Sequence, residues 1–394
     1  MKDFNFYAPT EVVFGEQAEE QVAALVKKYG GTKVLVHYGG QSAVRSGLLE
    51  KVCGLLAEGG VPFVKLGGVV PNPRLSLAKK GIELCRKEGV DFILAVGGGS
   101  VIDSAKCIAY GMCMEGDVWD IYTGKATPEK AIPVASVLTI PAAGSEMSEA
   151  SVITNEDGDV KLGYSNNISR PKFAIMNPRR TFTLPPYQTA AGVTDIMMHT
   201  MERYFNTDCD MTLTDAVAEA LMRTMKECVF AVLKNPEDYR NRAQIMWGGS
   251  LAHNDVTGNR NNGDWSTHQL EHELSGLFDV THGAGLAAIW PSWARYVMHE
   301  NLSRFVRFAV NVMEVPNDFT DPEGTAMRGI EAMERFYHAI GMPVNIKELI
   351  GRDITDEEIK EMTRKCSRDY KRTCGCFKVL AAEDMEAIYR MARG

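Results

Sequence analysis

The chain of 394 residues lacks the features that would place it in a membrane or on a nucleic acid. No apolar stretch approaches the roughly 20 residues that a transmembrane helix needs. The formal charge is -8 at pH 7 and no block of Lys and Arg stands out, which argues against nucleic acid or an anionic membrane as a partner. The first residues contain Asp3 and Glu11 and no signal-peptide core, so we expect a cytoplasmic protein.

A disulfide framework is also absent. The nine cysteines are odd in number and scattered along the chain, which predicts reduced and mostly buried thiols. Cys374-Gly375-Cys376 is not accompanied by a second cysteine pair, so a zinc ribbon is not indicated. We therefore expect a structural or incidental role for these two cysteines.

The first half of the chain alternates strand and helix signals. A chain of this length is too long for one core, so about two domains are expected. The alternation predicts βαβ units and a mostly parallel sheet, with helices starting at Ser42 and within 71–89. A polar turn at 156–159 predicts a hairpin over 151–164. The apolar runs that predict strands are 34–38, 62–66, 91–96, 131–141 and 172–176.

The composition changes after Pro185-Pro186, where Ala, Met, Leu and Glu begin to recur at helical spacing. The expected fold class is therefore α/β plus all-α. We expect an α/β dinucleotide-binding domain over 1–186 and a helical domain over 187–394, with loops near 259–264 and 315–323.

Two glycine turns each follow an apolar strand and precede a helix. The turns are Gly39-Gly40 and Gly97-Gly98-Gly99-Ser100. Glycine lets the backbone approach a pyrophosphate, and the following helix offers free N–H groups. A tight turn without a ligand fits the second pattern equally well. If the turns bind a nucleotide, we expect the contacts to it to come from Gly39, Gly40, Gly98, Gly99 and Ser100. Asp103 would then lie near the nicotinamide; alternatively it is a first-turn residue that matches the helix dipole.

The residues after the first turn bear on the choice of coenzyme. An NAD site usually places a carboxylate against the ribose 2′-OH. This turn is followed by Ser42 and Arg45, with no Asp or Glu. We therefore predict NADP(H), with NAD(H) as the alternative, unless Arg45 is only a solvated helix residue.

Asp195 and His199 lie four residues apart in an apolar run, so a helix places them on one face. A charged Asp195 between Val193 and Ile196 is costly to bury without a partner. A divalent cation would satisfy it. The alternative is a salt bridge to Arg179 or Arg180.

His268 and His282 are the candidates to complete this site. On one unbroken helix they would lie ~21 Å apart at about 1.5 Å per residue, so a shared ion requires a break between them. Gly276, Asp279 and Thr281 supply that signal, and we expect a new helix entered at His282. One carboxylate and three imidazoles suit a transition metal, Fe²⁺ or Zn²⁺. Spacing alone does not separate His268 from His272.

The stretch from His268 to His272 also spells H-x-x-E-H, which is an inverted zinc-peptidase motif. In that alternative, Glu271 would be the catalytic base and a third ligand would lie downstream. It would leave Asp195, His199 and the glycine turns without a role.

Several motifs along the whole chain resemble the iron-containing alcohol dehydrogenase family, in its butanol dehydrogenase or aldehyde reductase branch. The matching stretches include GGGSVIDSAK, LTIPAAGSEMS, NPRRTFTLPPYQTAAGVTDIMMHTMERYF, HQLEHEL and THGAGLA. The resemblance implies a dehydroquinate synthase-like fold, with an N-terminal dinucleotide-binding domain, a C-terminal helical metal-binding domain, and a homodimer.

The resemblance also assigns residues. It makes Asp195, His199, His268 and His282 the metal ligands, and His272 a histidine near the nicotinamide. Further nucleotide contacts are implied for Asn72, Thr139, Ser148, Lys161 and Leu184. The chain departs from the family in Ala143-Gly144, where many members carry Thr-Gly, and near Ser148, where some carry Asn.

These assignments predict a dehydrogenase or aldehyde reductase in which His272 relays a proton to solvent and Asp103 acts beside the nicotinamide. No Lys or Arg occurs over 181–202 or 261–290, so a phosphorylated or dicarboxylate substrate is not expected. Apolar candidates for the pocket wall are Trp265, Leu277 and Phe278. We expect a neutral primary alcohol or aldehyde of short to medium chain, with glycerol or another polyol as the alternative.

Overall fold

The computed structural model describes residues 3–207, 211–258 and 263–394. Contacts within the chain divide it into two compact units. The N-terminal unit comprises Ala8–Thr183. The C-terminal unit comprises Leu184–Gly394 together with Met1–Tyr7.

The N-terminal unit is built on a six-stranded sheet in the described part of the chain. All neighbouring strands are parallel, in the order β1-β8-β5-β4-β2-β3. The strands predicted from the apolar runs are confirmed, whereas β1 was not predicted because its four residues carry only a short signal. The strands are β1 (Glu11–Phe14), β2 (Val34–Tyr38), β3 (Phe63–Leu66), β4 (Phe92–Gly97), β5 (Val134–Leu138) and β8 (Phe173–Met176).

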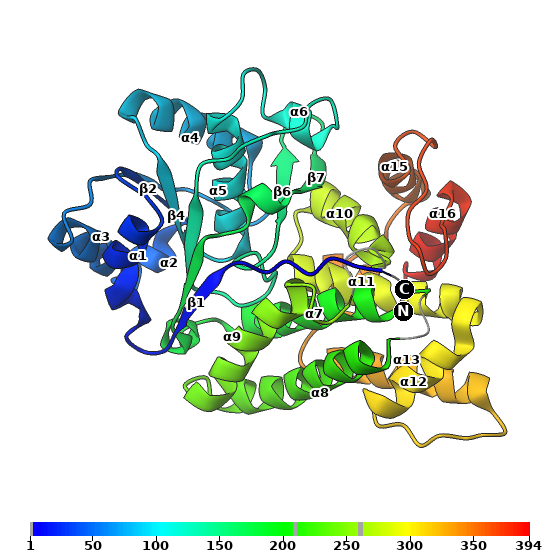
Figure 1. The fold of residues 1–394 in the computed structure, drawn as a ribbon. Coiled ribbons are helices and arrows are strands. Elements are labelled where there is room, and N and C mark those ends of the chain that lie inside the picture. The colour runs from blue at the N-terminus through cyan, green and yellow to red at the C-terminus, as the bar shows by residue number, and fades with distance from the viewer. Residues whose placement is uncertain (1–2, 208–210, 259–262) are drawn as a thin grey trace. The chain divides into compact units, whose positions relative to one another are not determined.

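Helices cover both faces of this sheet, which explains why β4 is apolar and buried along its whole length. Phe92, Leu94 and Val96 share a core with residues of α1 and α3. Helix α5 packs against β4, and α4 packs against α5 (Figure 1). The helices of this unit are η1 (Ala18–Gln21), α1 (Val22–Lys28), α2 (Gln41–Arg45), α3 (Leu48–Glu58), α4 (Leu75–Glu88), α5 (Gly99–Met112), α6 (Trp119–Tyr122), η2 (Asn167–Ser169) and η3 (Pro178–Thr181).

Two details of this unit refine the sequence predictions. The helix expected from Ser42 is two helices, α2 and α3, because Gly47 adopts a left-handed conformation (φ 71°) between them. The predicted hairpin is confirmed as β6 (Ala150–Asn155) paired antiparallel with β7 (Val160–Ser165).

The C-terminal unit is helical, as expected. Its long first helix, α7, begins at Pro186, and the missing N–H of proline costs nothing at that position. No helix in the described part of the chain is both long enough and apolar enough to span a bilayer. The helices are α7 (Pro186–Tyr204), α8 (Thr212–Lys234), α9 (Tyr239–His253), α10 (Ser266–Phe278), α11 (His282–Val297), η4 (Met298–Asn301), α12 (Leu302–Asn311), α13 (Pro322–Ala339), α14 (Ile346–Ile350), α15 (Asp356–Cys366) and α16 (Ala382–Met391).

The break predicted between His268 and His282 is confirmed. Helix α10 ends at Phe278, Asp279 adopts a left-handed conformation (φ 50°), and α11 begins at His282. The loop predicted near 315–323 lies between α12 and α13. Most of the other predicted loop, 259–262, lies outside the described residues.

The cysteines in the described residues are free thiols, and most are buried, as predicted. Cys209 lies outside that part of the chain. Gly375 (φ 86°) turns the chain so that the backbone N–H of Cys376 donates to Asp264 Oδ2 at 3.0 Å. This contact ties the tail to the start of α10 and supports a structural role for the Cys374-Gly375-Cys376 segment.

Candidate metal and nucleotide sites

Helix α7 carries the first pair of predicted ligands, and both are buried. One helical turn separates them, so His199 Nδ1 lies 2.9 Å from the backbone oxygen of Asp195 and 3.1 Å from Asp195 Oδ1. The i,i+4 spacing thus brings carboxylate and imidazole onto one face, as predicted.

Helices α10 and α11 bring the other two predicted ligands to Asp195. Asp195 Oδ1 lies 3.8 Å from His268 Nε2 and 3.8 Å from His282 Nε2. One ligand atom from each of these three residues lies within 4.8 Å of the others, so the three could share a metal ion. His199 is not in that group of three, but its ring centroid is 4.6 Å from that of His268.

The residues present fit a divalent cation. Asp195 Oδ1 and His268 Nε2 are buried and accept or donate no hydrogen bond among the described residues. A buried polar atom without a hydrogen-bond partner destabilises the folded state unless an ion or a water molecule binds to it. Arg179 and Arg180, the alternative partners of Asp195, pair within the N-terminal unit with Glu16 at 2.7 Å and with Glu19 at 2.6 Å.

The electrostatics of the cluster favour positive charge. Burial alone raises the pKa of Asp195, but the imidazoles of His199, His268 and His282 lower it well below its usual value. Burial lowers the pKa of His268, but the carboxylates of Asp195 and Glu202 outweigh it and raise this pKa to about 9. A proton therefore occupies the cluster readily, and a bound cation would displace it.

Two buried carboxylates lie directly behind the imidazoles, and the sequence analysis assigned neither to this position. Glu202 Oε1 accepts from His268 Nδ1 at 2.9 Å, and Glu271 Oε2 faces His282 Nδ1. The sequence does contain a signal for both. Glu202 lies three residues after His199, and Glu271 three after His268, so each shares a helix face with a ligand.

This arrangement disfavours the peptidase alternative. Glu271, which would be the catalytic base, has one oxygen directed at His282 and the other at Ser275 Oγ. His272, which the motif would require as a ligand, is not part of the three-residue group. Its ring centroid lies 5.9 Å from that of His282.

The three residues predicted to line the substrate pocket do not lie together in the structure. Trp265 lies beside the cluster, with ring centroids 5.4 Å from His268 and 6.0 Å from His199. Phe278 instead packs beneath the guanidinium of Arg352, and Leu277 packs on the helical core. Arg203 stacks on Trp265 at 4.7 Å, and its guanidinium donates to His199 and Ala252 oxygens and to Asp255.

The two glycine turns lie side by side at the carboxyl edge of the sheet, because β2 and β4 are neighbours. A Cβ on Gly40 would meet open space, whereas one on Gly99 would lie 2.9 Å from Ala143 Cβ. Ser100 falls in the first turn of α5, where backbone N–H groups are free of helical partners. This edge fits a pyrophosphate, and Thr139, directly after β5, borders it through a 3.1 Å hydrogen bond to Gly97.

The other predicted nucleotide contacts lie in the N-terminal unit, except for Leu184. Ser42 and Arg45 are exposed on α2. Asn72 is buried with a left-handed backbone (φ 54°), and Lys161 is buried on β7. Leu184, the first residue of the C-terminal unit, is half-buried.

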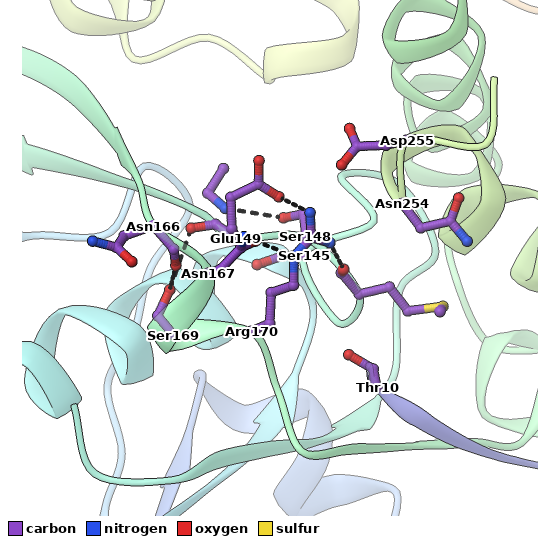
Figure 2. Close-up of polar contacts among 12 residues, drawn as sticks. Thr10, Ser145, Ser148, Glu149, Asn166, Asn167, Ser169, Arg170, Asn254 and Asp255 are labelled. Atoms are coloured by element: carbon purple, nitrogen blue, oxygen red, sulfur yellow. Dashed lines mark hydrogen bonds and ion pairs between the residues drawn. The ribbon is translucent and has the colours of Figure 1, made fainter. Parts of the chain in front are cut away.

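Asp103 and Ser148 are engaged inside the N-terminal unit. Asp103 Oδ1 accepts from Ser145 Oγ at 2.5 Å and Oδ2 from the N–H of Val152 at 3.0 Å, which ties α5 to β6. Burial raises the pKa of Asp103. Ser148 is buried and lies beside Ser145 and Glu149 (Figure 2). Its carbonyl accepts from Lys106 Nζ at 2.9 Å. These contacts support structural roles, and the roles of both residues at the coenzyme stay predictions.

Comparison with known proteins gives full-length matches. The iron-containing alcohol dehydrogenase family model matches residues 9–178, and the model of the C-terminal part of the Fe-containing alcohol dehydrogenase family matches 189–393. The chain is 38% identical over 392 residues to NADH-dependent butanol dehydrogenase A of Clostridium acetobutylicum, covering 99% of both. It is 33% identical to the NADPH-dependent aldehyde reductase YqhD of Escherichia coli, covering 88% of this chain and 89% of that protein.

The fold agrees with these matches. The crystal structure of NADH-dependent butanol dehydrogenase A from Thermotoga maritima superposes with a TM-score of 0.95 at 36% identity, covering 100% of this chain and 99% of that one. The predicted fold, with an N-terminal parallel sheet and a C-terminal helical part, is confirmed. This chain belongs to the iron-containing alcohol dehydrogenase family, in its butanol dehydrogenase and aldehyde reductase branch.

Proposed function

We propose that this chain interconverts neutral aldehydes and primary alcohols of short to medium chain, using a nicotinamide coenzyme and one divalent metal ion. The observation that carries the proposal is a pair of buried atoms, Asp195 Oδ1 and His268 Nε2, that make no hydrogen bond among the described residues and lie among closely spaced ligand atoms. The names of the relatives, butanol dehydrogenase and aldehyde reductase, support the same substrate class.

Each part of the site has a distinct task. Asp195, His199, His268 and His282 would hold the ion. The ion supplies Lewis-acid polarisation of the substrate oxygen, and the nicotinamide supplies or accepts hydride. His282, with 27% of its side chain exposed against 5% for Asp195, is on the side of the cluster that solvent reaches. His272, also on α10, is our candidate to pass the alcohol proton to solvent.

The substrate class follows from the charges around the cluster. Arg203 is a cation near the cluster, and its guanidinium is engaged by backbone oxygens and by Asp255. It is therefore not offered to a substrate phosphate or carboxylate. Trp265 supplies an apolar surface beside His268, which suits a neutral chain.

The coenzyme proposal is NADP(H). The turn between β2 and α2 contains no carboxylate to pair with a ribose 2′-OH, and Ser42 and Arg45 are exposed directly after it. Four relatives are named for NADH, one for NADPH and one for NADP, so relatedness alone does not decide the preference. Ser42→Asp should lower kcat/KM with NADPH at least about tenfold by like-charge repulsion and leave NADH less affected.

The deciding experiment is reconstitution of metal-free protein with Fe²⁺ or Zn²⁺ under anaerobic conditions. We expect butanal reduction only after metal addition, with a higher kcat/KM for NADPH than for NADH, and weak turnover of glycerol. Asp195→Asn should abolish both metal binding and activity. Undiminished activity in metal-free protein, or in Asp195→Asn, would contradict the proposal.

A further inference from the structure

Two of the imidazoles in the candidate metal centre are each held by a carboxylate from a neighbouring position in the C-terminal unit. Glu202 Oε1 accepts from both the backbone N–H of His268, at 3.0 Å, and its Nδ1, at 2.9 Å. Glu271 Oε2 accepts from His282 Nδ1. A carboxylate can only accept here, so each Nδ1 carries a proton, and each Nε2 is the nitrogen that a metal ion would bind in place of any proton there.

The position of Glu271 is built by several residues. Its side chain is fully buried, and its second oxygen, Oε1, accepts from Ser275 Oγ one helical turn later. On α11, Gly285 leaves the space for it, because a Cβ there would come 2.7 Å from Glu271 Oε1. Both oxygens are thus fixed, and the carboxylate has little freedom to turn away from His282.

His199 is held differently. Its Nδ1 lies 2.9 Å from the backbone oxygen of Asp195, so the hydrogen-bond partner of this ring comes from its own helix. His268 and His282 lie on two other helices, and their side chains need a partner outside their own turn. Glu202 connects α7 to α10, and Glu271 connects α10 to α11.

We propose that Glu202 and Glu271 are positioning residues that set the metal affinity of this site by fixing the tautomer and direction of His268 and His282. The inference rests on the proposed metal centre. Partners of this kind raise the basicity of the imidazole and hold the ring in place, and their loss typically weakens metal binding about 10- to 100-fold.

The test measures metal binding directly. Metal-free wild type, Glu271→Gln, Glu271→Ala and Glu202→Gln are titrated with Zn²⁺ against a chromophoric chelator, and with Co²⁺ to record the d–d spectrum. We expect Kd for Zn²⁺ to rise about 10- to 100-fold in Glu271→Ala. Glu271→Gln should lose less Zn²⁺ affinity, because the glutamine side-chain oxygen can still accept the hydrogen bond from His282 Nδ1. The Co²⁺ bands should change in intensity in each of these variants.

Glu219→Gln is the matched control. Glu219 is also buried in the C-terminal unit and accepts from Tyr204, Arg307 and Asn311, none of which is a candidate ligand. Its loss should lower thermal stability and leave Kd for Zn²⁺ unchanged.

Wild-type Kd values and Co²⁺ spectra in both the Glu202 and Glu271 variants would overturn the inference while leaving the metal centre intact. If Glu271→Ala does not fold, Glu271→Gln decides by the same two measurements. If wild type binds neither Zn²⁺ nor Co²⁺, the metal centre itself is wrong and the inference falls with it.

Discussion

His268 and His272 lie one turn apart on α10, yet the structure gives them different surroundings. His268 is buried, with its two ring nitrogens facing Glu202 and Asp195. His272 is half-buried, and its ring neighbours that of His282 without joining the closely spaced ligand atoms. The distinction depends on where α7 and α11 lie against α10, which is long-range information that local spacing does not contain.

Replacing His272 tests its assigned role. His272→Ala should lower kcat for butanal reduction about 100-fold, because a proton relay is removed, while the metal content stays at the wild-type value. The measurement is steady-state kinetics with metal analysis on the same sample. His338→Ala, which removes an exposed histidine paired with Glu348 at 3.0 Å, is the control. Loss of the metal in His272→Ala would instead make this residue a ligand.

At the level of helices, the metal centre depends on how closely α7 and α11 approach. Gly283, directly after His282, lies against α7, and a Cβ there would come 2.0 Å from the backbone oxygen of Ala191. Backbone cannot move aside as a side chain can. The glycine therefore sets the distance between the helix that carries Asp195 and the helix that carries His282.

Gly283→Ala should accordingly separate these helices and weaken the site. We expect a loss of stability of about 1–3 kcal/mol from overpacking, together with weaker Zn²⁺ binding. Thermal unfolding and chelator competition measure the two effects. Gly54→Ala in α3, where a Cβ meets open space, should cause neither. A wild-type Kd in Gly283→Ala would show that the helix spacing does not control the ligands.

Helix α15, which packs against α10, begins with a pH-sensitive cap. The hydrogen bond from Arg352 and the backbone N–H of Thr355 lower the pKa of Glu358 to about 2, against a small opposing effect of burial. In the unfolded chain the pKa of Glu358 is near 4.5. Because folding lowers this pKa, the ionised carboxylate stabilises the folded state at pH values above 4.5, and this stabilisation is lost as the pH falls toward 2.

Glu358→Gln should therefore be less stable than wild type at pH 7, and the gap should narrow below pH 4.5. Thermal unfolding of both proteins at pH 7, 5 and 4 tests this. A difference in unfolding temperature between wild type and Glu358→Gln that stays constant or grows as the pH falls would contradict the prediction. Glu357→Gln, at an exposed neighbour in the same first turn, controls for loss of charge at the start of the helix.

Most strands of the N-terminal unit and the helical class of the C-terminal unit follow from local sequence signals. The buried run of β4, the hairpin of β6 and β7, and the break before His282 were all predicted and are confirmed. Strand β1 was not, because its signal is short and its partner β8 is about 160 residues away. The division of one expected helix into α2 and α3 depends on a single left-handed glycine, whose conformation residue type alone does not fix.

The candidate metal ligands were easier to predict from the sequence than the residues that contact them. The candidate metal ligands were predicted from residue type and spacing, and the family resemblance was needed to choose His268. Glu202 and Glu271 share helix faces with ligands, so their spacing held a usable signal that was not applied. The engagement of Asp103 and Ser148 within the fold could not be foreseen, because it depends on β6 and on Lys106 lying beside them.

Considered as a whole molecule, the chain divides its tasks between its two units. The glycine turns belong to the N-terminal unit, and the candidate metal ligands lie on α7, α10 and α11 of the C-terminal unit. Metal binding should therefore stabilise the C-terminal unit in particular. Four of the five tryptophans lie in that unit, Trp119 being the other, so intrinsic fluorescence reports mainly on it.

Removal of the metal should lower the unfolding temperature seen by tryptophan fluorescence. An ion present at about 100 times its Kd contributes ~2.7 kcal/mol, which corresponds to a shift of about 5–10 °C for a unit of this size. Dialysis against a chelator followed by Zn²⁺ addition should lower and then restore the midpoint. In Asp195→Asn, the chelator should cause no shift; a shift of wild-type size there would mean that stabilisation comes from elsewhere.

The close approach of Gly283 to Ala191 and the glycine turns at the sheet edge are encoded in different stretches of the gene. Mutant libraries that vary coenzyme choice can be confined to codons around 39–45, and libraries that vary the metal to codons around 195–202 and 268–285. Gains found in one library can then be recombined with gains from the other by a single crossover near codon 186, without disrupting either set of substitutions.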